Sequence, residues 1–366
     1  MEFGRNNVVN YGIRTLALGA MAFAVLMGSG LPVAAGGVVY IPLGSAGQIV
    51  FVDVEQDRVV DHIDGLPAVH GLAGTPDGRF LVAGSYEERE PGDAVPAKPA
   101  GMSEDEHAAH HARPSDGAAG GGTVVSTVSI VSIGERAVMR RIDVPGAVHH
   151  VAVSPDGGVA VVTHPNQDAI SAIDLRSHKV LVTVPTGPLP NFAVFSPDGR
   201  QVYVSNAGDD TVSTFDTASW EVLGDIAVGS SPEHLVLSHD GGTLYVNNVA
   251  DGTVSVLDLR AGQVAGTISV GDTLHGVDLS DDGRTLFVSA LGEDKLTAVN
   301  LLTGAHRSTT LGPAPYHLAV VRGSGKIYVS SAEEPKLWVV DQETLEVRGE
   351  IPIGGKGHQM VQVTGQ

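Results

Sequence analysis

Short runs of alternating apolar and polar residues recur along the chain, and each predicts a β-strand with one buried face. Four of these runs end in an acid or an amide: TVSTFD at 211–216, TVSVLD at 253–258, KLTAVN at 295–300 and KLWVVD at 336–341. A second β-rich stretch precedes each of them, reading YVSN at 203–206, YVNN at 245–248, FVSA at 287–290 and YVSS at 328–331. Turns of the Pro-Asp-Gly type recur at 76–78, 155–157 and 197–199, with variants at 239–241 and 281–283. The pattern predicts units of four short strands joined by tight turns.

These units repeat about every 42 residues. The first strands begin near residues 70, 149, 191, 233, 275, 316 and 358, so every interval is 41 or 42 residues except the first, which is 79. Four-stranded units of this length are typical of β-propeller blades. The long first interval indicates an insertion in the first full blade.

The two ends of the chain complete the count of blades. The last unit offers one strand, 358–363, and the N-terminal part offers three, at 37–42, 48–53 and 58–63. Pairing these four strands would close the ring and remove its open edges. We therefore predict an all-β fold, a seven-bladed β-propeller of four-stranded blades spanning residues 36–366. An open β-solenoid is the alternative.

The Pro-Asp-Gly turn followed by Tyr-Val-Ser-Asn or Tyr-Val-Asn-Asn resembles the repeat of the YVTN-type propellers. That superfamily includes the YncE-like proteins, the haem d1 domain of cytochrome cd1 and the propeller half of nitrous oxide reductase. The resemblance covers nearly all of the chain after the first 35 residues except the insertion. It implies the fold without fixing a function, because one fold hosts many activities.

The N-terminus has the pattern of an export signal. Arg5 and Arg14 precede an uncharged apolar run at 15–30, and Val33-Ala34-Ala35 supplies small residues before a cleavage point. We predict a signal peptide over 1–35 and a periplasmic or secreted protein with no membrane span after cleavage. An uncleaved N-terminal anchor is the alternative.

Charge and cysteine content narrow the function. The formal net charge is −20, which disfavours nucleic-acid binding. The chain has no cysteine, so disulfides, thiolate metal sites and the copper-binding cupredoxin part of nitrous oxide reductase are excluded. No P-loop, dinucleotide fingerprint or nucleophile elbow is present. An enzyme is therefore not the favoured interpretation.

Histidine recurs at one place in the repeat, the start of the first strand. The residues are His70, His149, His150, His234, His275, His317 and His358. First strands are innermost in a propeller, so these imidazoles would meet at a channel mouth and could bind Zn²⁺ or Cu²⁺. Counted from the turns, His70, His149 and His275 share one repeat position. The other four lie one residue later in the repeat, namely His150, His234, His317 and His358. Because alternate strand residues face opposite ways, we expect only three or four to point inward. A strand-entry cap copied by duplication is the alternative.

The insertion, residues 87–122, is rich in Pro, Gly, Ala and acids, and we expect it to be disordered in the free protein. It contains a compact group of potential ligands, namely Glu104, Glu106, His107, His110 and His111. The loop resembles the His-rich loops of periplasmic zinc-binding proteins, including zinc chaperones that are propellers. That resemblance implies capture or transfer of the ion, and a solvated acidic loop is the alternative.

Together these features favour an exported metal carrier or metallochaperone for zinc first and copper second. The expected partners are the metal ion and a metal-transporter binding protein or another periplasmic protein, and we expect a monomer. Two alternatives stay open: a YncE-like interaction scaffold without metal, and a propeller that handles haem d1 or is a metal-dependent enzyme. For the enzyme, Glu233 beside His234 is the pair at the channel mouth.

Overall fold

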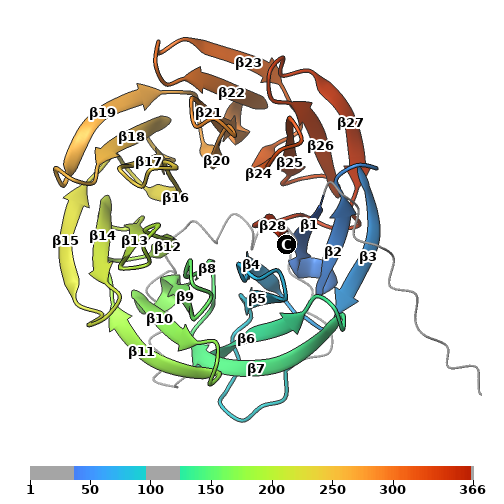
Figure 1. Ribbon diagram of the computed structural model, residues 1–366, viewed down its shortest axis with the longest axis vertical. Helices are drawn as coiled ribbons and strands as arrows, with labels where there is room; N and C mark the ends of the chain where they lie inside the picture. Colours follow the sequence, from blue (N-terminus) through green and yellow to red (C-terminus); the bar gives the residue numbers. More distant parts are fainter. Residues whose placement is uncertain (1–36, 96–123, 364–366) are drawn as a thin grey trace, which may run out of the picture. The chain divides into compact units, whose positions relative to one another are not determined.

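The computed structural model describes residues 37–95 and 124–363, and these residues form seven sheets of four antiparallel strands in a ring (Figure 1). The predicted all-β, seven-bladed propeller is confirmed. The predicted signal peptide, 1–35, lies outside the described residues. Among those described, no helix is long and apolar enough to span a bilayer.

We number the blades 1 to 7 by their innermost strands, from β4 to β28. Blade 1 contains β4 (Val69–Gly74), β5 (Phe80–Ser85), β6 (Val125–Ser132) and β7 (Ala137–Pro145). Blade 2 contains β8 (Val151–Val153), β9 (Val159–His164), β10 (Ala169–Asp174) and β11 (Lys179–Pro185). Blade 3 contains β12 (Pro190–Phe195), β13 (Gln201–Asn206), β14 (Thr211–Asp216) and β15 (Val222–Ala227). Blade 4 contains β16 (Pro232–Leu237), β17 (Thr243–Asn248), β18 (Thr253–Asp258) and β19 (Gln263–Ser269).

The remaining blades follow the same plan. Blade 5 contains β20 (Leu274–Leu279), β21 (Thr285–Ala290), β22 (Lys295–Asn300) and β23 (His306–Thr310). Blade 6 contains β24 (Pro315–Val321), β25 (Lys326–Ser331), β26 (Lys336–Asp341) and β27 (Val347–Pro352). Blade 7 contains β28 (Val361–Val363), β1 (Val38–Leu43), β2 (Gln48–Asp53) and β3 (Arg58–Asp64). Short 3₁₀ turns occur at η1 (Gly44–Ala46), η2 (Pro165–Gln167) and η3 (Leu291–Glu293).

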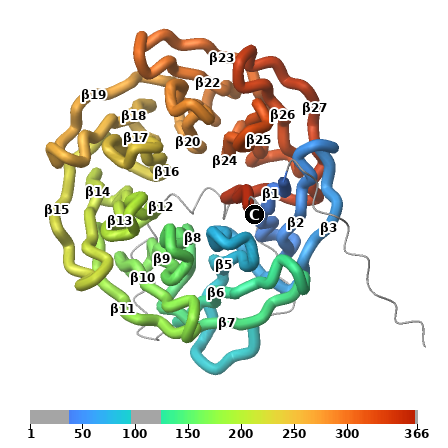
Figure 2. Tube along the Cα trace, in the orientation of Figure 1, coloured from blue at the N-terminus to red at the C-terminus, as the bar shows by residue number. Residues whose placement is uncertain are grey.

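Blade 7 joins the two ends of the described chain. Strand β28 pairs antiparallel with β1, with Val363 opposite Val38 and Val361 opposite Tyr40. Figure 2 shows this C-terminal segment, in red, beside the blue N-terminal strands. The closing strand, Val361–Val363, is shorter than the expected 358–363, although the His358 N–H still donates a hydrogen bond to the Pro42 carbonyl on β1.

The recurring turns are held by the aspartate that the sequence repeats. In blade 3, Asp198 Oδ1 accepts hydrogen bonds from Ser196 Oγ at 2.7 Å and from the Arg200 N–H at 3.1 Å. Gly199 follows with φ of 69°, a conformation that other residues rarely adopt. The same aspartate bonds recur in blades 1, 2, 4 and 5. These aspartates are structural.

The insertion begins inside the described region. Arg89 forms an isolated bridge with Val125 and an ion pair with Asp143 on β7. The Glu88 carboxylate accepts a hydrogen bond from the Ala147 N–H at 2.9 Å. Residues up to 95 thus fold back on blade 1. The five potential ligands of the loop, Glu104, Glu106, His107, His110 and His111, lie outside the described residues.

Candidate metal centre at the propeller axis

The seven clustered histidines occupy two adjacent positions at the entry of the innermost strands. In blade 3, Ala193 pairs with Val204 and serves as the reference residue. Position A is two residues before it, at Asn191, and position B is one residue before it, at Phe192. The matching pairings of the other blades give position A as His70, His149, Asn191, Glu233, His275, Tyr316 and His358. Position B is Gly71, His150, Phe192, His234, Gly276, His317 and Gln359.

One assignment from the sequence is therefore wrong. We expected His358 at the later position, but Val361 pairs with Tyr40, which places His358 at position A. In blades 1, 2, 4 and 5 the position of the histidine was counted back from the Asp-Gly turn, but no such turn follows the closing strand of blade 7.

The expectation that the two positions face opposite ways is also wrong for three of the residues. His234 and His317 at position B converge with His275 at position A, and ligand nitrogens of the three lie within 4.8 Å of one another. The ladders of blades 4, 5 and 6 shift register across these positions. A bulge turns the backbone, so the simple alternation of a regular strand does not hold there.

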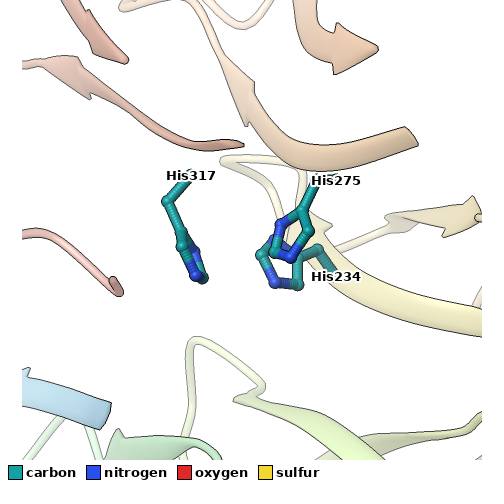
Figure 3. Close-up of side chains that lie close together, drawn as sticks. All are labelled: His234, His275 and His317. Carbon is teal, nitrogen blue, oxygen red and sulfur yellow. The ribbon is translucent and has the colours of Figure 1, made fainter. Parts of the chain in front are cut away.

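These three residues form the candidate metal centre. Ring centroids are 4.3 Å apart for His234 and His275, 4.9 Å for His234 and His317, and 4.6 Å for His275 and His317. Figure 3 shows the three rings projecting toward one another from three strands. With Zn–N bonds of about 2.0–2.1 Å, tetrahedral ligand nitrogens stand about 3.3 Å apart, so small side-chain rotations would complete a three-histidine site.

The environment keeps at least one of these imidazoles neutral. His317 is buried, and burial together with the neighbouring His234 and His358 holds its pKa well below the ordinary value. Its Nε2 atom has no hydrogen-bond partner among the described residues. A neutral imidazole is the form that binds a metal ion.

A buried tyrosine and a buried glutamate adjoin the centre. The Tyr316 ring lies 3.7 Å from that of His275 and 4.3 Å from that of His317. Burial, with the Glu233 carboxylate as a lesser contribution, raises the pKa of Tyr316 well above its usual range, so its hydroxyl stays protonated. Tyr316 was not among the residues predicted for the site, although it stands at the repeat position where four other blades have histidine.

The other four histidines are equally buried, and all seven are between 3% and 7% exposed. His70 lies between His149 and His358, with ring centroids at 4.5 and 4.3 Å. His150 stacks on Phe192 at 3.4 Å, and its Nδ1 accepts a hydrogen bond from the Ala193 N–H. The structure thus brings His234, His275 and His317 together, and it sets His150 apart against an aromatic ring.

The fold and its axial cluster define the class: a seven-bladed β-propeller with a histidine-lined inner ring. Within that class, residues 183–347 match the family model described as YNCE-like beta-propeller. The family resemblance seen in the sequence is thereby confirmed over these residues.

Solved structures share this fold at low sequence identity. A functionally unknown protein from Desulfotomaculum acetoxidans DSM 771 matches with a TM-score of 0.69 and 14% identity, over 90% of this chain and 100% of that one. Kuenenia stuttgartiensis hydrazine synthase matches with a TM-score of 0.60 and 18% identity, over 82% and 88%. Dihydro-heme d1 dehydrogenase NirN, in complex with DHE, matches with a TM-score of 0.60 and 13% identity, over 89% and 75%. No curated protein matches the sequence. The structural similarities concern the fold alone.

Proposed function

We propose that this protein binds a transition-metal ion at the propeller axis through His234, His275 and His317, and that it serves as an exported metal carrier or metallochaperone. The observation that supports this is the convergence of three buried imidazoles from three blades. Zinc is the favoured ion and copper the second, because imidazole nitrogen suits both and no thiolate is available.

A carrier fits the arrangement better than a structural zinc site does. Structural zinc sites use four protein ligands, whereas three histidines leave a fourth position for a ligand from a donor or an acceptor. The propeller is already closed by strand pairing in blade 7, so its fold does not need a metal staple. The proposed acceptor is a metal-transporter binding protein or another periplasmic protein.

The test is titration of tag-free, metal-stripped protein with Zn²⁺ and Cu²⁺ against a competing chelator. The decisive variant is H275F/H317F, which keeps two rings in the core and removes their nitrogens. The matched control is H306A, because His306 is an exposed histidine on the outer strand β23. A third variant lacks residues 103–112, so that binding by the loop is measured separately.

One tight site that survives loop deletion and disappears in H275F/H317F supports the proposal. Binding that is lost with the loop and retained in H275F/H317F refutes it. If wild type binds Zn²⁺ and Cu²⁺ only as weakly as exposed carboxylates do, a metal-free interaction scaffold explains the protein better. A saturable shift of the visible absorption bands of added haem d1, without metal binding, would instead favour the haem-handling alternative.

A further inference from the structure

Six of the seven inner-ring histidines fall into two groups, each from three consecutive blades, and the seventh, His150, stacks on Phe192. His234, His275 and His317 come from blades 4, 5 and 6, and His358, His70 and His149 come from blades 7, 1 and 2. Blade 3 has Asn191 and Phe192 at the same place. The order of β28, β4 and β8 around the axis can be followed in Figure 1. We call His70, His149 and His358 the second arc.

The second arc is a row centred on His70, whereas only His234, His275 and His317 have ligand nitrogens all within 4.8 Å of one another among the described residues. The His70 ring lies 4.3 Å from that of His358 and 4.5 Å from that of His149. The distances to the first group are longer, at 5.8 Å between His317 and His358 and 6.4 Å between His317 and His70. The two groups are therefore neighbours with separate centres.

Backbone carbonyls fix the tautomers of two members of the second arc. His70 Nδ1 lies 2.8 Å from the His149 carbonyl oxygen, and His149 Nδ1 lies 3.1 Å from the Asn191 carbonyl oxygen. A carbonyl only accepts, so in both rings Nδ1 carries the proton and Nε2 carries the lone pair. A hydrogen bond from the second ring nitrogen to a carbonyl is the usual support of a metal-ligating histidine.

A glycine makes this arrangement possible. A Cβ atom on Gly71, the residue after His70, would stand 2.9 Å from the His149 carbonyl oxygen and from backbone atoms of His150 and Val151. Contacts that short do not occur for real side chains. Only glycine at 71 lets the first strands of blades 1 and 2 approach closely enough for the His70 ring to reach the next blade's carbonyl.

From these observations we infer a second metal site, for an ion of the zinc class, on His70, His149 and His358. The inference rests on the proposed metal-binding function and extends it from one ion to two. His70 stands in the middle of the row, so His149 and His358 rotate toward it when the ion binds. Two adjoining sites would let a second ion enter before the first is delivered.

The experiment counts zinc per chain by elemental analysis and by competition titration, with Co²⁺ absorbance as a second probe of the ligand field. All proteins lack residues 103–112, so the loop contributes no ligand. Four are compared: the parent, H70F/H149F, H275F/H317F and the quadruple variant. The expected numbers of tight ions are two, one, one and none, and H306A in the parent background keeps two. Far-UV circular dichroism and thermal unfolding verify that each variant folds.

The outcomes separate the two claims. One ion in the parent and in H70F/H149F, with none in H275F/H317F, would overturn the second site and leave the proposed function standing. One ion in the parent and in H275F/H317F, with none in H70F/H149F, would overturn the triad of the proposed function and keep the second arc. No tight ion in the parent would overturn both.

Discussion

Replacing His164 by asparagine is expected to make the propeller less sensitive to acid. His164 ends β9 and is fully buried. Its Nδ1 donates to the Ala147 carbonyl oxygen at 3.1 Å, and its Nε2 accepts from Ser171 Oγ at 2.8 Å. That pattern suits the neutral ring, and burial lowers the pKa of His164 from 6.5 to about 4.

The size of the effect follows from this shift. The unfolded chain binds a proton at His164 near pH 6.5 and the folded chain only near pH 4, so stability is complete above pH 6.5 and falls as the pH drops toward 4. At pH 5 the preferential protonation of His164 in the unfolded chain lowers the unfolding free energy by about 2 kcal/mol. Asparagine does not titrate and occupies the matching place in blades 3 and 4, where Asn206 donates to Ser213 Oγ at 2.8 Å.

The assay is urea unfolding of wild type, H164N and the exposed control H306N at pH 7.5 and pH 5.0. Wild type and H306N are expected to lose the same amount of unfolding free energy between the two pH values, and H164N about 2 kcal/mol less. Other buried histidines, His150 and His317 among them, contribute to the loss in all three proteins and cancel in the comparison. If H164N loses as much as wild type, the protonation of His164 is not a source of acid sensitivity, and the reasoning is refuted.

Three further predictions concern the scaffold. The Asp57 carboxylate of blade 7 accepts hydrogen bonds from Tyr328 Oη at 2.6 Å and Lys326 Nζ at 2.7 Å, both in blade 6. D57N removes this charge and should lower the unfolding free energy measured by urea titration by about 1–2 kcal/mol. An unchanged midpoint would mean that this contact does not help to close the ring. D198A should cost about 1 kcal/mol by removing the acceptor of Ser196 and Arg200, and no loss would refute the structural role of the turn. G71A should lower the melting temperature because the new Cβ atom would lie 2.9 Å from backbone atoms of blade 2. The control G349A should not, because no atom lies within 4 Å of its Cβ position, and equal melting temperatures of the two variants would contradict the close approach of blades 1 and 2.

The fold could be predicted because its signals are local and repeated. Each blade carries its own alternation and its own turn, such as Ser196 with Asp198, and the four strands pair with one another in sequence. Ring closure could be predicted from the number of strands, because the single strand at the C-terminal end and the three at the N-terminal end together make one four-stranded blade. None of these inferences required knowing how one blade packs on the next.

The candidate site was harder because it depends on contacts between blades. The sequence located the histidines at the strand entries, but the register shifts that turn His234, His275 and His317 toward one point appear only in the assembled sheets. Tyr316 was missed because a phenol does not stand out among imidazoles until its ring is seen against His275. The position of His358 was misassigned because no Asp-Gly turn follows the closing strand from which it could be counted.

The distribution of histidine over two positions bears on why the residues are there. A cap copied by duplication would keep one position, and it would make the same hydrogen bond in each blade. His70 and His149 do bond to the next blade's carbonyl, as a cap would. His234 and His317, however, stand at the position that is glycine in blades 1 and 5, phenylalanine in blade 3 and glutamine in blade 7. The strand entry therefore does not need histidine at that position, yet those two rings meet His275 from the other position at a single point. Under the proposed metal-binding function this convergence is expected, and His150, at the same position in blade 2 but stacked on Phe192, is the histidine that it leaves to the strand-cap alternative.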